Sequence, residues 1–391
     1  MNPNYNISNE EALLLKLCRL AFTDEMSERI RKLVFAVNDW NYFGSLANKH
    51  GAEALVYHNL KKYDLLADIP VDVTSGLRNA LMLNLSRNTS HIKVMEDILK
   101  LLNSENIKTV LLKGLALELT DYGNAGLRQM TDIDVLIRKD QSIKARNILL
   151  SNGFVSLPVK SIIYKSIISS VGKHLPSLIR EGTSFEIHTE LFGAGASKLT
   201  TYLYKSSYET EINGEKTFIP KPQIFFLYLI KHLFLHELNN ESQLRLYTDL
   251  VVLMDNHREE IVNQELLSLA AQAGMEEILV QRLEPIGRFW GIRFPEWLNE
   301  FIGRWIRPGS SDSFIFFLRS PKENPVTDKS KFYRQIIKDI PGFHRKLLFL
   351  TGDIFPTISF MKKRYRCKST WKALLFYPHR FGKILYLFGK K

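Results

Sequence analysis

The sequence predicts a mixed α/β (α+β) fold in which a small sheet is flanked by helical regions on both sides. Apolar residues recur with helical spacing before residue 107 and after residue 220, whereas short apolar runs with strand-like alternation lie between these positions. The 391 residues are 45% hydrophobic and 24% charged, as in a globular protein of two or three domains. We expect an N-terminal helical region, a mixed core, a helical domain and a basic C-terminal extension, over residues 1–106, 107–220, 221–305 and 306–391.

The composition excludes several classes of protein. The two cysteines, Cys18 and Cys367, cannot form a disulfide framework or a cysteine-rich zinc module, and they suit a reducing compartment. The longest apolar run, residues 224–230, is far shorter than the roughly 18 residues that a membrane-spanning helix needs. The first basic residue is Lys16, so the basic start of a signal peptide is missing. We therefore expect a cytoplasmic protein.

The N-terminal region is predicted to be helical. Ser8 and Glu11 have the spacing of a capping box, and a helical pattern follows them. Residues 40–63 predict two short helices that meet near Gly51, and residues 81–107 predict one long helix.

Strands are expected only in the middle of the chain. A helix is expected to begin after Lys113-Gly114, and Asp140 is expected to cap another helix that ends at Asn152-Gly153. The predicted strands are residues 107–112, 132–137, 185–191 and 214–220.

Helices are expected again after residue 220. Pro222 suits the first turn of a helix, and residues 224–238 and 243–257 are the clearest helical segments. Residues 303–313 contain Pro, Gly and Ser and predict a linker.

Paired carboxylates on a predicted strand are the most informative feature. Side chains alternate across a strand, so Asp132 and Asp134 share one face of residues 132–137 and the apolar residues share the other. Their side chains are about 7 Å apart along the strand, from the rise of about 3.4 Å per residue. Such a pair can hold metal ions, but it also occurs on solvated sheet edges.

A third carboxylate comes from the strand predicted over residues 185–191. Its alternation places Glu186, His188 and Glu190 on one face. If this strand lies beside the one that carries the two aspartates, Glu186 joins them. Oxygen ligands of this kind are what Mg²⁺ prefers, with phosphate and water completing its shell.

A strand, a glycine and a helix follow one another about 20 residues before the aspartates. This arrangement points backbone N–H groups at a helix N-terminus, where a phosphate can bind, and Lys113 adds a positive charge next to Gly114. The sequence contains no P-loop of the Walker type.

The order of these motifs resembles the polymerase-β-type nucleotidyltransferase superfamily, and more narrowly a bacterial nucleotidyltransferase family with an LKG-x-A-L motif. The resemblance spans roughly residues 40–285. The matching residues are WNYFGSLANKHG (40–51), LLKGLAL (111–117), Arg128, DIDVLI (132–137), NGF (152–154), Glu186, His188, His232, His236, Arg245 and Asp249.

The resemblance implies a polymerase-β-like fold and transfer of a nucleoside monophosphate from an NTP to an acceptor hydroxyl or amine, with release of pyrophosphate. Asp132 and Asp134 would hold two Mg²⁺ (or Mn²⁺) ions, and Glu186 would bind the catalytic ion and help deprotonate the acceptor. Lys113 and the Gly114 backbone would bind the nucleotide phosphates.

Two residues depart from the superfamily pattern. Lys113-Gly114 stands where a Gly-Ser pair is usual, and Glu186 stands where Asp is more usual.

Arg128 and His188 are expected to bind the nucleotide. Arg128 would steer the triphosphate or else cover the surface. His188 shares a face with Glu186 and would order the site, or it is an ordinary core histidine.

The downstream matches have structural and functional interpretations. His232 and His236 either line the cleft or lie satisfied in the core, and the segment lacks the H-E-x-x-H motif of zinc proteases. Arg245 and Asp249 are four residues apart, so they form either a helix ion pair or a cleft-facing pair that braces the domains.

The charge of +12 is concentrated at the end of the chain. From Lys329 onward there are 16 Lys and Arg against two Asp, so the first 328 residues sum to −2. In residues 361–391 the basic residues alternate with Trp, Tyr and Phe. Such a tail is suited to binding RNA. It is equally suited to the surface of an anionic membrane, where the protein would be peripheral. A third interpretation is a helical lid that packs on the body.

Two further functions stay open at this stage. The enzyme would modify the end of a tRNA or another RNA, as related toxin-type nucleotidyltransferases do. Alternatively, Glu186 and Lys113 mark a decayed site in a nucleotide-binding scaffold protein without catalytic activity.

Overall fold

The chain forms two compact units, each built from separate stretches of sequence. The computed structural model describes residues 7–157, 161, 174–192, 197–239, 241, 243–306, 309–320, 334, 337–338, 340 and 342–389. We call the first the helical unit, made of Met1–Lys93, Leu112–Thr131 and Pro220–Val326, and the second the sheet unit, made of Val94–Leu111, Asp132–Ile219 and Thr327–Lys391.

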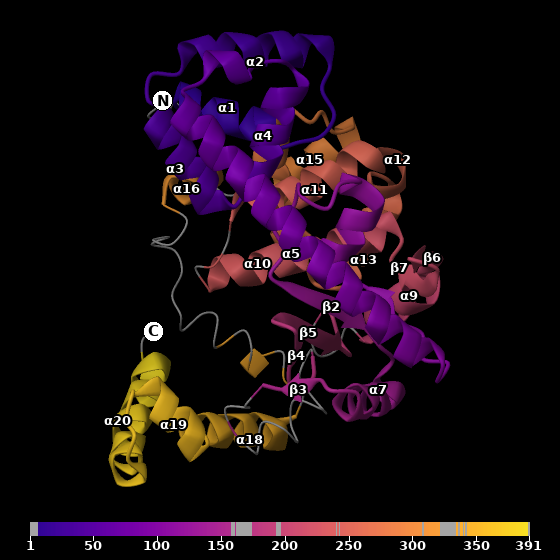
Figure 1. Cartoon of the computed structure of the whole chain (residues 1–391), viewed down its shortest axis with the longest axis vertical. Coiled ribbons are helices and arrows are strands. Elements are labelled where there is room, and N and C mark those ends of the chain that lie inside the picture. Colours follow the sequence, from indigo (N-terminus) through magenta and orange to yellow (C-terminus); the bar gives the residue numbers. More distant parts are fainter. Residues whose placement is uncertain are drawn as a thin grey trace. The chain divides into compact units, whose positions relative to one another are not determined.

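The helical unit contains the segments that flank the predicted core (Figure 1). Helix α5 begins in it and continues into the sheet unit. Its elements are α1 (Asn9–Leu17), α2 (Asp24–Ala36), α3 (Trp40–His50), α4 (Glu53–Lys62), the 3-10 turn η1 (Leu66–Asp68), α5 (Val71–Asn103), α6 (Lys113–Leu117), the π-helical turn η2 (Glu118–Tyr122), α10 (Pro222–Leu238), α11 (Leu244–Asn256), α12 (Arg258–Ile261), α13 (Gln264–Gln272), α14 (Glu276–Trp290), α15 (Glu296–Trp305) and α16 (Ser310–Arg319).

Local signals set several of these boundaries as predicted. The Ser8 hydroxyl accepts from the Glu11 N–H, and the Glu11 carboxylate accepts from the Ser8 N–H, which completes the capping box of α1. Gly51 ends α3 with a left-handed φ of +63°. Helix α5 begins at Val71, ten residues before the predicted start, because its first turns are too polar to show an apolar stripe.

Helix α10 is the buried centre of the helical unit. Pro222 occupies its first turn as predicted, and its side chains from Pro222 to Lys231 are all buried. A helix that is apolar on every side belongs in a core. Helix α10 packs against α11, α12, α13 and α14, while α1 packs against α2, α3, α4 and α14. Helices that precede the sheet strands in the chain and helices that follow them thus form one body.

The sheet unit contains one mixed sheet of seven strands in the order β3-β4-β5-β2-β1-β7-β6. The pairs β2–β5 and β1–β7 are parallel and the other neighbours are antiparallel. Its strands are β1 (Val110–Leu111), β2 (Asp132–Leu136), β3 (Val155–Ser156), β4 (Leu178–Arg180), β5 (Thr183–His188), β6 (Tyr208–Ile212) and β7 (Glu215–Ile219). The mixed α/β fold with flanking helices is therefore confirmed.

Some predicted boundaries are wrong. Helix α7 (Lys139–Ser151) is preceded by Arg138 at its N-cap, and Asp140 accepts two hydrogen bonds of 2.6 Å from the Arg138 guanidinium instead of capping the helix. The linker predicted over residues 303–313 is too long, because α16 already begins at Ser310; its residues 307 and 308 lie outside the described part of the chain.

The remaining helices of the sheet unit are α9 (Ser197–Ser206), α18 (Phe343–Ile354), α19 (Ile358–Arg364) and α20 (Thr370–Gly389). The last three lie side by side in yellow in Figure 1, and α20 packs against both others. In the described part of the chain, no helix combines the length and the apolar character that a transmembrane segment requires.

Candidate active site

Two parallel strands bring the predicted carboxylates together. Strands β2 and β5 pair in register, with Asp134 opposite Glu186 and Asp132 opposite Ser184. Residues that face each other across two strands project their side chains from the same side of a sheet. Asp134 and Glu186 therefore share one face, while Ile133 and Phe185 are buried on the other side. The two strands are neighbours, which is the condition under which Glu186 was expected to join the aspartates.

His188 lies between the two carboxylates. Its Nε2 is 2.7 Å from Oδ1 of Asp134 and 3.6 Å from Oε2 of Glu186. The exposed fractions of the Asp134 and His188 side chains are only 2% and 7%. Burying a carboxylate is costly unless it has a partner, and this imidazole is a hydrogen-bond partner of Asp134.

Glu186 is held by residues from both sides. The Ser177 hydroxyl donates a 2.8 Å hydrogen bond to Oε1, and Nδ1 of His174 lies 3.9 Å from Oε2. Burial raises the pKa of Glu186, but the neighbouring imidazoles of His188 and His174 outweigh it and lower the pKa to about 2. The carboxylate is therefore negatively charged at neutral pH.

These side chains have the chemistry of a metal site. Oxygen or nitrogen atoms of Asp134, Glu186 and His188 all lie within 4.8 Å of one another, and no other cluster of this kind occurs among the described residues. Two carboxylates suit Mg²⁺ or Mn²⁺, and an imidazole added to them suits Mn²⁺ better than Mg²⁺. Asp132 is outside this cluster; it lies two residues before Asp134 on the same face of β2 and is partly exposed.

The sequence pattern missed two neighbours of Glu186 and misplaced one acid. His174 and Ser177 precede β4, a short strand without a sequence signal of its own. Strand β5 ends at His188, so Glu190 is not on the face predicted for it. Its carboxylate instead accepts hydrogen bonds from the backbone of Leu191 and Phe192 and from the Thr200 hydroxyl.

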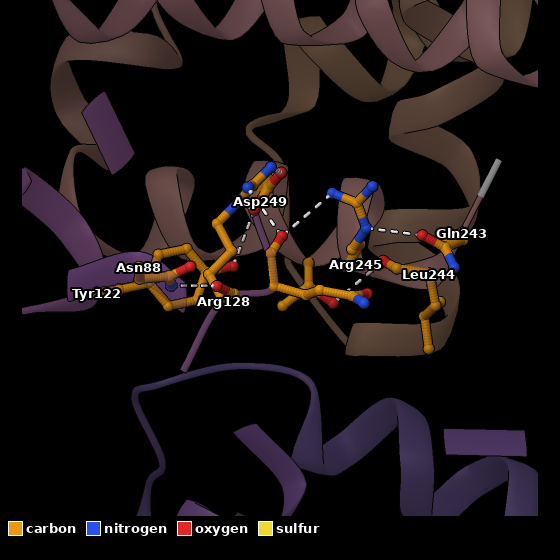
Figure 2. Close-up of polar contacts among 9 residues, drawn as sticks. Asn88, Tyr122, Arg128, Gln243, Leu244, Arg245 and Asp249 are labelled. Carbon is orange, nitrogen blue, oxygen red and sulfur yellow. Dashed lines mark hydrogen bonds and ion pairs between the residues drawn. The ribbon is translucent and has the colours of Figure 1, made fainter. Parts of the chain in front are cut away.

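Arg128 is buried in the helical unit, so the alternative that it covers the surface is wrong. Its guanidinium binds both carboxylate oxygens of Asp249 at 2.7 Å, as Figure 2 shows. The Tyr122 hydroxyl donates a 2.9 Å hydrogen bond to the same carboxylate, and the Asn88 amide donates to the Arg128 carbonyl. Burial lowers the pKa of Arg128, but Asp249 outweighs it and raises the pKa above its ordinary value.

Arg245 lies one helical turn before Asp249 on α11, and it contacts a side-chain amide and a backbone carbonyl. Its Nε donates to the Gln243 side chain at 2.7 Å and its guanidinium reaches the Gln129 carbonyl at 3.5 Å (Figure 2). Asp249 thus finds its ionic partner in Arg128, which is 121 residues earlier in the chain.

Further predicted residues of the helical unit lie close together. The rings of His232 and His236 are 4.4 Å apart on α10. Burial, followed by the positive charges of Lys113 and Arg245, lowers the pKa of His236. Lys113 and Arg245 therefore both act on this histidine as positive charges.

The backbone at Lys113-Gly114 is unusual. Lys113 has a φ of +49°, a left-handed conformation that side chains other than glycine seldom adopt and that concentrates at functional sites. A Cβ on Gly114 would collide with the Arg128 guanidinium and would lie 2.9 Å from the Met130 side chain. Gly114 therefore permits close contact between α6 and the segment that leads to β2.

A comparison with families of known proteins agrees with these features. The sequence profile of a family described as "Uncharacterised nucleotidyltransferase" matches residues 36–291. Among solved structures, an antigenic nucleotidyltransferase-like protein from Paracoccidioides brasiliensis matches at 17% identity and a TM-score of 0.32, over 52% of this chain and 93% of that one. No curated protein sequence matches. Because the profile covers well over half of the chain, the protein belongs to this nucleotidyltransferase family.

Proposed function

We propose that this protein transfers a nucleoside monophosphate from an NTP to an acceptor hydroxyl or amine and releases pyrophosphate. The observation that carries the proposal is the in-register pairing of Asp134 with Glu186 on parallel strands, in a member of a nucleotidyltransferase family. Two carboxylates on one sheet face, one buried and one half-buried, suit divalent cations. Such cations bind the phosphates of a nucleoside triphosphate.

Asp132, Asp134 and Glu186 are the residues that we propose as ligands of Mg²⁺ or Mn²⁺. The donor set fits such ions, because two carboxylates and an imidazole converge within 4.8 Å. When bound there, the ions would neutralise the phosphates and acidify the acceptor group. His188 serves either as a further ligand or as the residue that fixes the Asp134 carboxylate.

The chain's own groups complete the proposed chemistry. Glu186 is ionised at neutral pH, so it can accept a hydrogen bond from the acceptor hydroxyl or amine and orient it for attack. His188 prevents Asp134 from turning away, because its Nε2 is within hydrogen-bond distance of Oδ1. Both effects hold the reacting groups in position before the substrate arrives, which lowers the barrier without further rearrangement.

Lys113 and Arg245 are the groups that we propose for the triphosphate. Both charges lower the pKa of His236, as cations near one imidazole do. Cations that surround phosphates stabilise the charge that develops in phosphoryl transfer. Arg128, by contrast, becomes a positioning residue in this proposal, since Asp249 already occupies its guanidinium and it holds the segment that continues into β2.

The test is pyrophosphate release from each of the four NTPs with Mg²⁺ or Mn²⁺, with cell extract as the source of acceptor. Asp134→Asn should reduce the rate by at least a thousandfold, and Asp132→Asn should reduce it strongly. Asp140→Asn is the matched control, because Asp140 is an exposed acid of the same unit and binds only Arg138 in the contacts described above. If no NTP releases pyrophosphate and the Asp132→Asn/Asp134→Asn variant binds NTP unchanged, the proposal is overturned.

A further inference from the structure

The end of the chain exposes large apolar side chains in a regular stripe. On α20 these residues are Trp371, Leu374, Leu375 and Phe381, and the first and third of them are 80% and 77% exposed. Positions spaced by three, four and seven residues lie on one side of a helix. Helix α18 also exposes Phe343 and Leu347, which are four residues apart.

The opposite side of α20 is already packed. Ala373 is fully buried, and the ring of Phe376 stacks on Tyr365 of the preceding segment with centroids 4.2 Å apart. The Tyr377 hydroxyl donates to the Pro356 carbonyl, and Arg380 donates to the Asp353 carbonyl. Helix α20 therefore has a face bound to α18 and α19 and a second apolar face that meets solvent.

The same helices are strongly basic. Residues 342–389 contain ten Lys and Arg and a single acid, Asp353. That acid is 3% exposed and its carboxylate binds Arg380, so it does not neutralise the other cations. Among the described side chains, Lys363, Arg364, Arg366, Lys368 and Lys372 are exposed next to the apolar stripe or in the segment leading to it.

We propose that α18–α20 bind the surface of an anionic membrane. The exposed Trp and Leu side chains of α20 would enter the boundary between headgroups and acyl chains, and the surrounding cations would contact the lipid phosphates. This combination of a basic polar surface and an apolar stripe is that of helices that lie in the membrane interface. Charge complementarity specifies an anionic lipid surface rather than a neutral one.

The aliphatic residues favour a membrane over RNA. RNA needs cations and flat aromatic or guanidinium surfaces on which bases stack. Leu374, Leu375 and Leu347 cannot stack on bases, whereas they gain from leaving water at a lipid interface. RNA binding is therefore the competing outcome, in which the aliphatic side chains would make no difference.

The experiment is co-sedimentation of the full chain with vesicles of phosphatidylcholine alone or of an equal mixture with phosphatidylglycerol. We expect binding only to the mixed vesicles, and a loss of affinity of at least tenfold in Trp371→Ser/Leu375→Ser and in Lys363→Gln/Arg364→Gln/Lys368→Gln. The matched control is Val71→Ser/Leu83→Ser, which removes apolar residues that are 79% and 65% exposed on α5. This control should bind like the unmodified chain.

Two results would overturn the proposal. One is the absence of binding to mixed vesicles. The other is binding that the charge variant weakens but Trp371→Ser/Leu375→Ser leaves unchanged; if a mixed-sequence RNA then shows the same pattern, the surface belongs to RNA. Because all substituted side chains are exposed, the variants should keep the fold, which circular dichroism checks. The readout is binding alone, so it is independent of nucleotidyl transfer.

Discussion

Nε2 of His188 lies 2.7 Å from Oδ1 of Asp134, and both side chains are almost completely buried. The two residues belong to neighbouring parallel strands, and His188 lies two residues after Glu186, which pairs with Asp134. The short distance ties the direction of this carboxylate to the sheet itself. A ligand held in this way is positioned before a metal ion or a nucleotide binds.

His188→Asn should lower the rate of NTP-dependent pyrophosphate release by 10- to 100-fold, the range that loss of a residue supporting a metal ligand produces. The concentration of Mn²⁺ needed for half-maximal rate should rise at the same time, because Asp134 loses its neighbour. The measurement is a metal titration at fixed NTP. His344→Asn on α18 is the control, since His344 is exposed. An unchanged titration for His188→Asn would show that the imidazole does not support the metal site.

Asp249→Ala should destabilise the protein by about 3–5 kcal/mol, because it leaves the buried guanidinium of Arg128 without its carboxylate. Urea denaturation measures this free energy. Glu28→Ala is the comparison: it breaks an ion pair with Lys32 in which both side chains are exposed, and should cost no more than about 0.5 kcal/mol.

A double substitution separates the free energy lost with the ion pair from the cost of leaving one buried charge without a partner. Arg128→Met/Asp249→Leu removes both charges and replaces them with apolar side chains, so it should be more stable than Asp249→Ala alone. If the double variant is as unstable as the two single losses added together, the pair contributes no coupling and Arg128 does not position the segment before β2 through Asp249.

The helices could be predicted wherever a local signal marks their ends. The capping box of Ser8 and Glu11, the left-handed Gly51 and Pro222 act on their immediate neighbours, and each is found where it was expected. The prediction for Asp140 was wrong because a charged residue near the start of a helix can also bind a neighbouring side chain. Here the Asp140 carboxylate binds the Arg138 guanidinium.

The sheet could be predicted only in its centre. Strands β3 and β4 have two and three residues, and their hydrogen bonds come from strands elsewhere in the chain, so no local pattern marks them. Edge strand β6 pairs with β7, but it is largely exposed. It therefore lacks the apolar face by which a strand is recognised in a sequence. Alternation predicted the face of each acid on β2 and β5, whereas the pairing of the two strands was only assumed.

The partners within the site were the least predictable part. Arg128 and Asp249 are 121 residues apart, and sequence spacing along α11 suggested Arg245 as the partner of Asp249 instead. The packing of η2 against α11 brings Tyr122 to this carboxylate. In the same way, Ser177 and His174 reach Glu186 through the pairing of β4 with β5, which no sequence pattern predicts.

Gly114→Ala should destabilise the protein by about 1–3 kcal/mol, because the new methyl group forces Arg128 or Met130 to move in a packed region. Gly76→Ala on α5 is the matched control: a Cβ there has no neighbour within 4 Å, so it should stabilise the helix by about 0.5–1 kcal/mol. Thermal and urea unfolding of both variants measure the difference. Equal effects at the two glycines would contradict the close approach at Gly114.

Glu118 should make the protein less stable as the pH rises. Its side chain is 4% exposed, and neither carboxylate oxygen has a hydrogen-bond partner among the described residues. Burial raises the pKa of Glu118 from 4.5 to about 8, against the opposing effect of Arg128. Between these pH values the unfolded chain releases this proton and the folded chain keeps it, so stability is fully present below pH 4.5 and falls up to about pH 8.

Glu118→Gln tests this dependence, because an amide of the same shape has no proton to lose. Near pH 5 the two proteins should be similarly stable, whereas near pH 8.5 the variant should be the more stable by a few kcal/mol, at about 1.4 kcal/mol for each pKa unit. Urea unfolding at both pH values provides the comparison, with Glu28→Gln as an exposed control that should leave the pH profile unchanged. Parallel pH profiles for Glu118→Gln and the unmodified chain would mean that Glu118 is ionised in the fold, with Arg128 compensating its charge as well as that of Asp249.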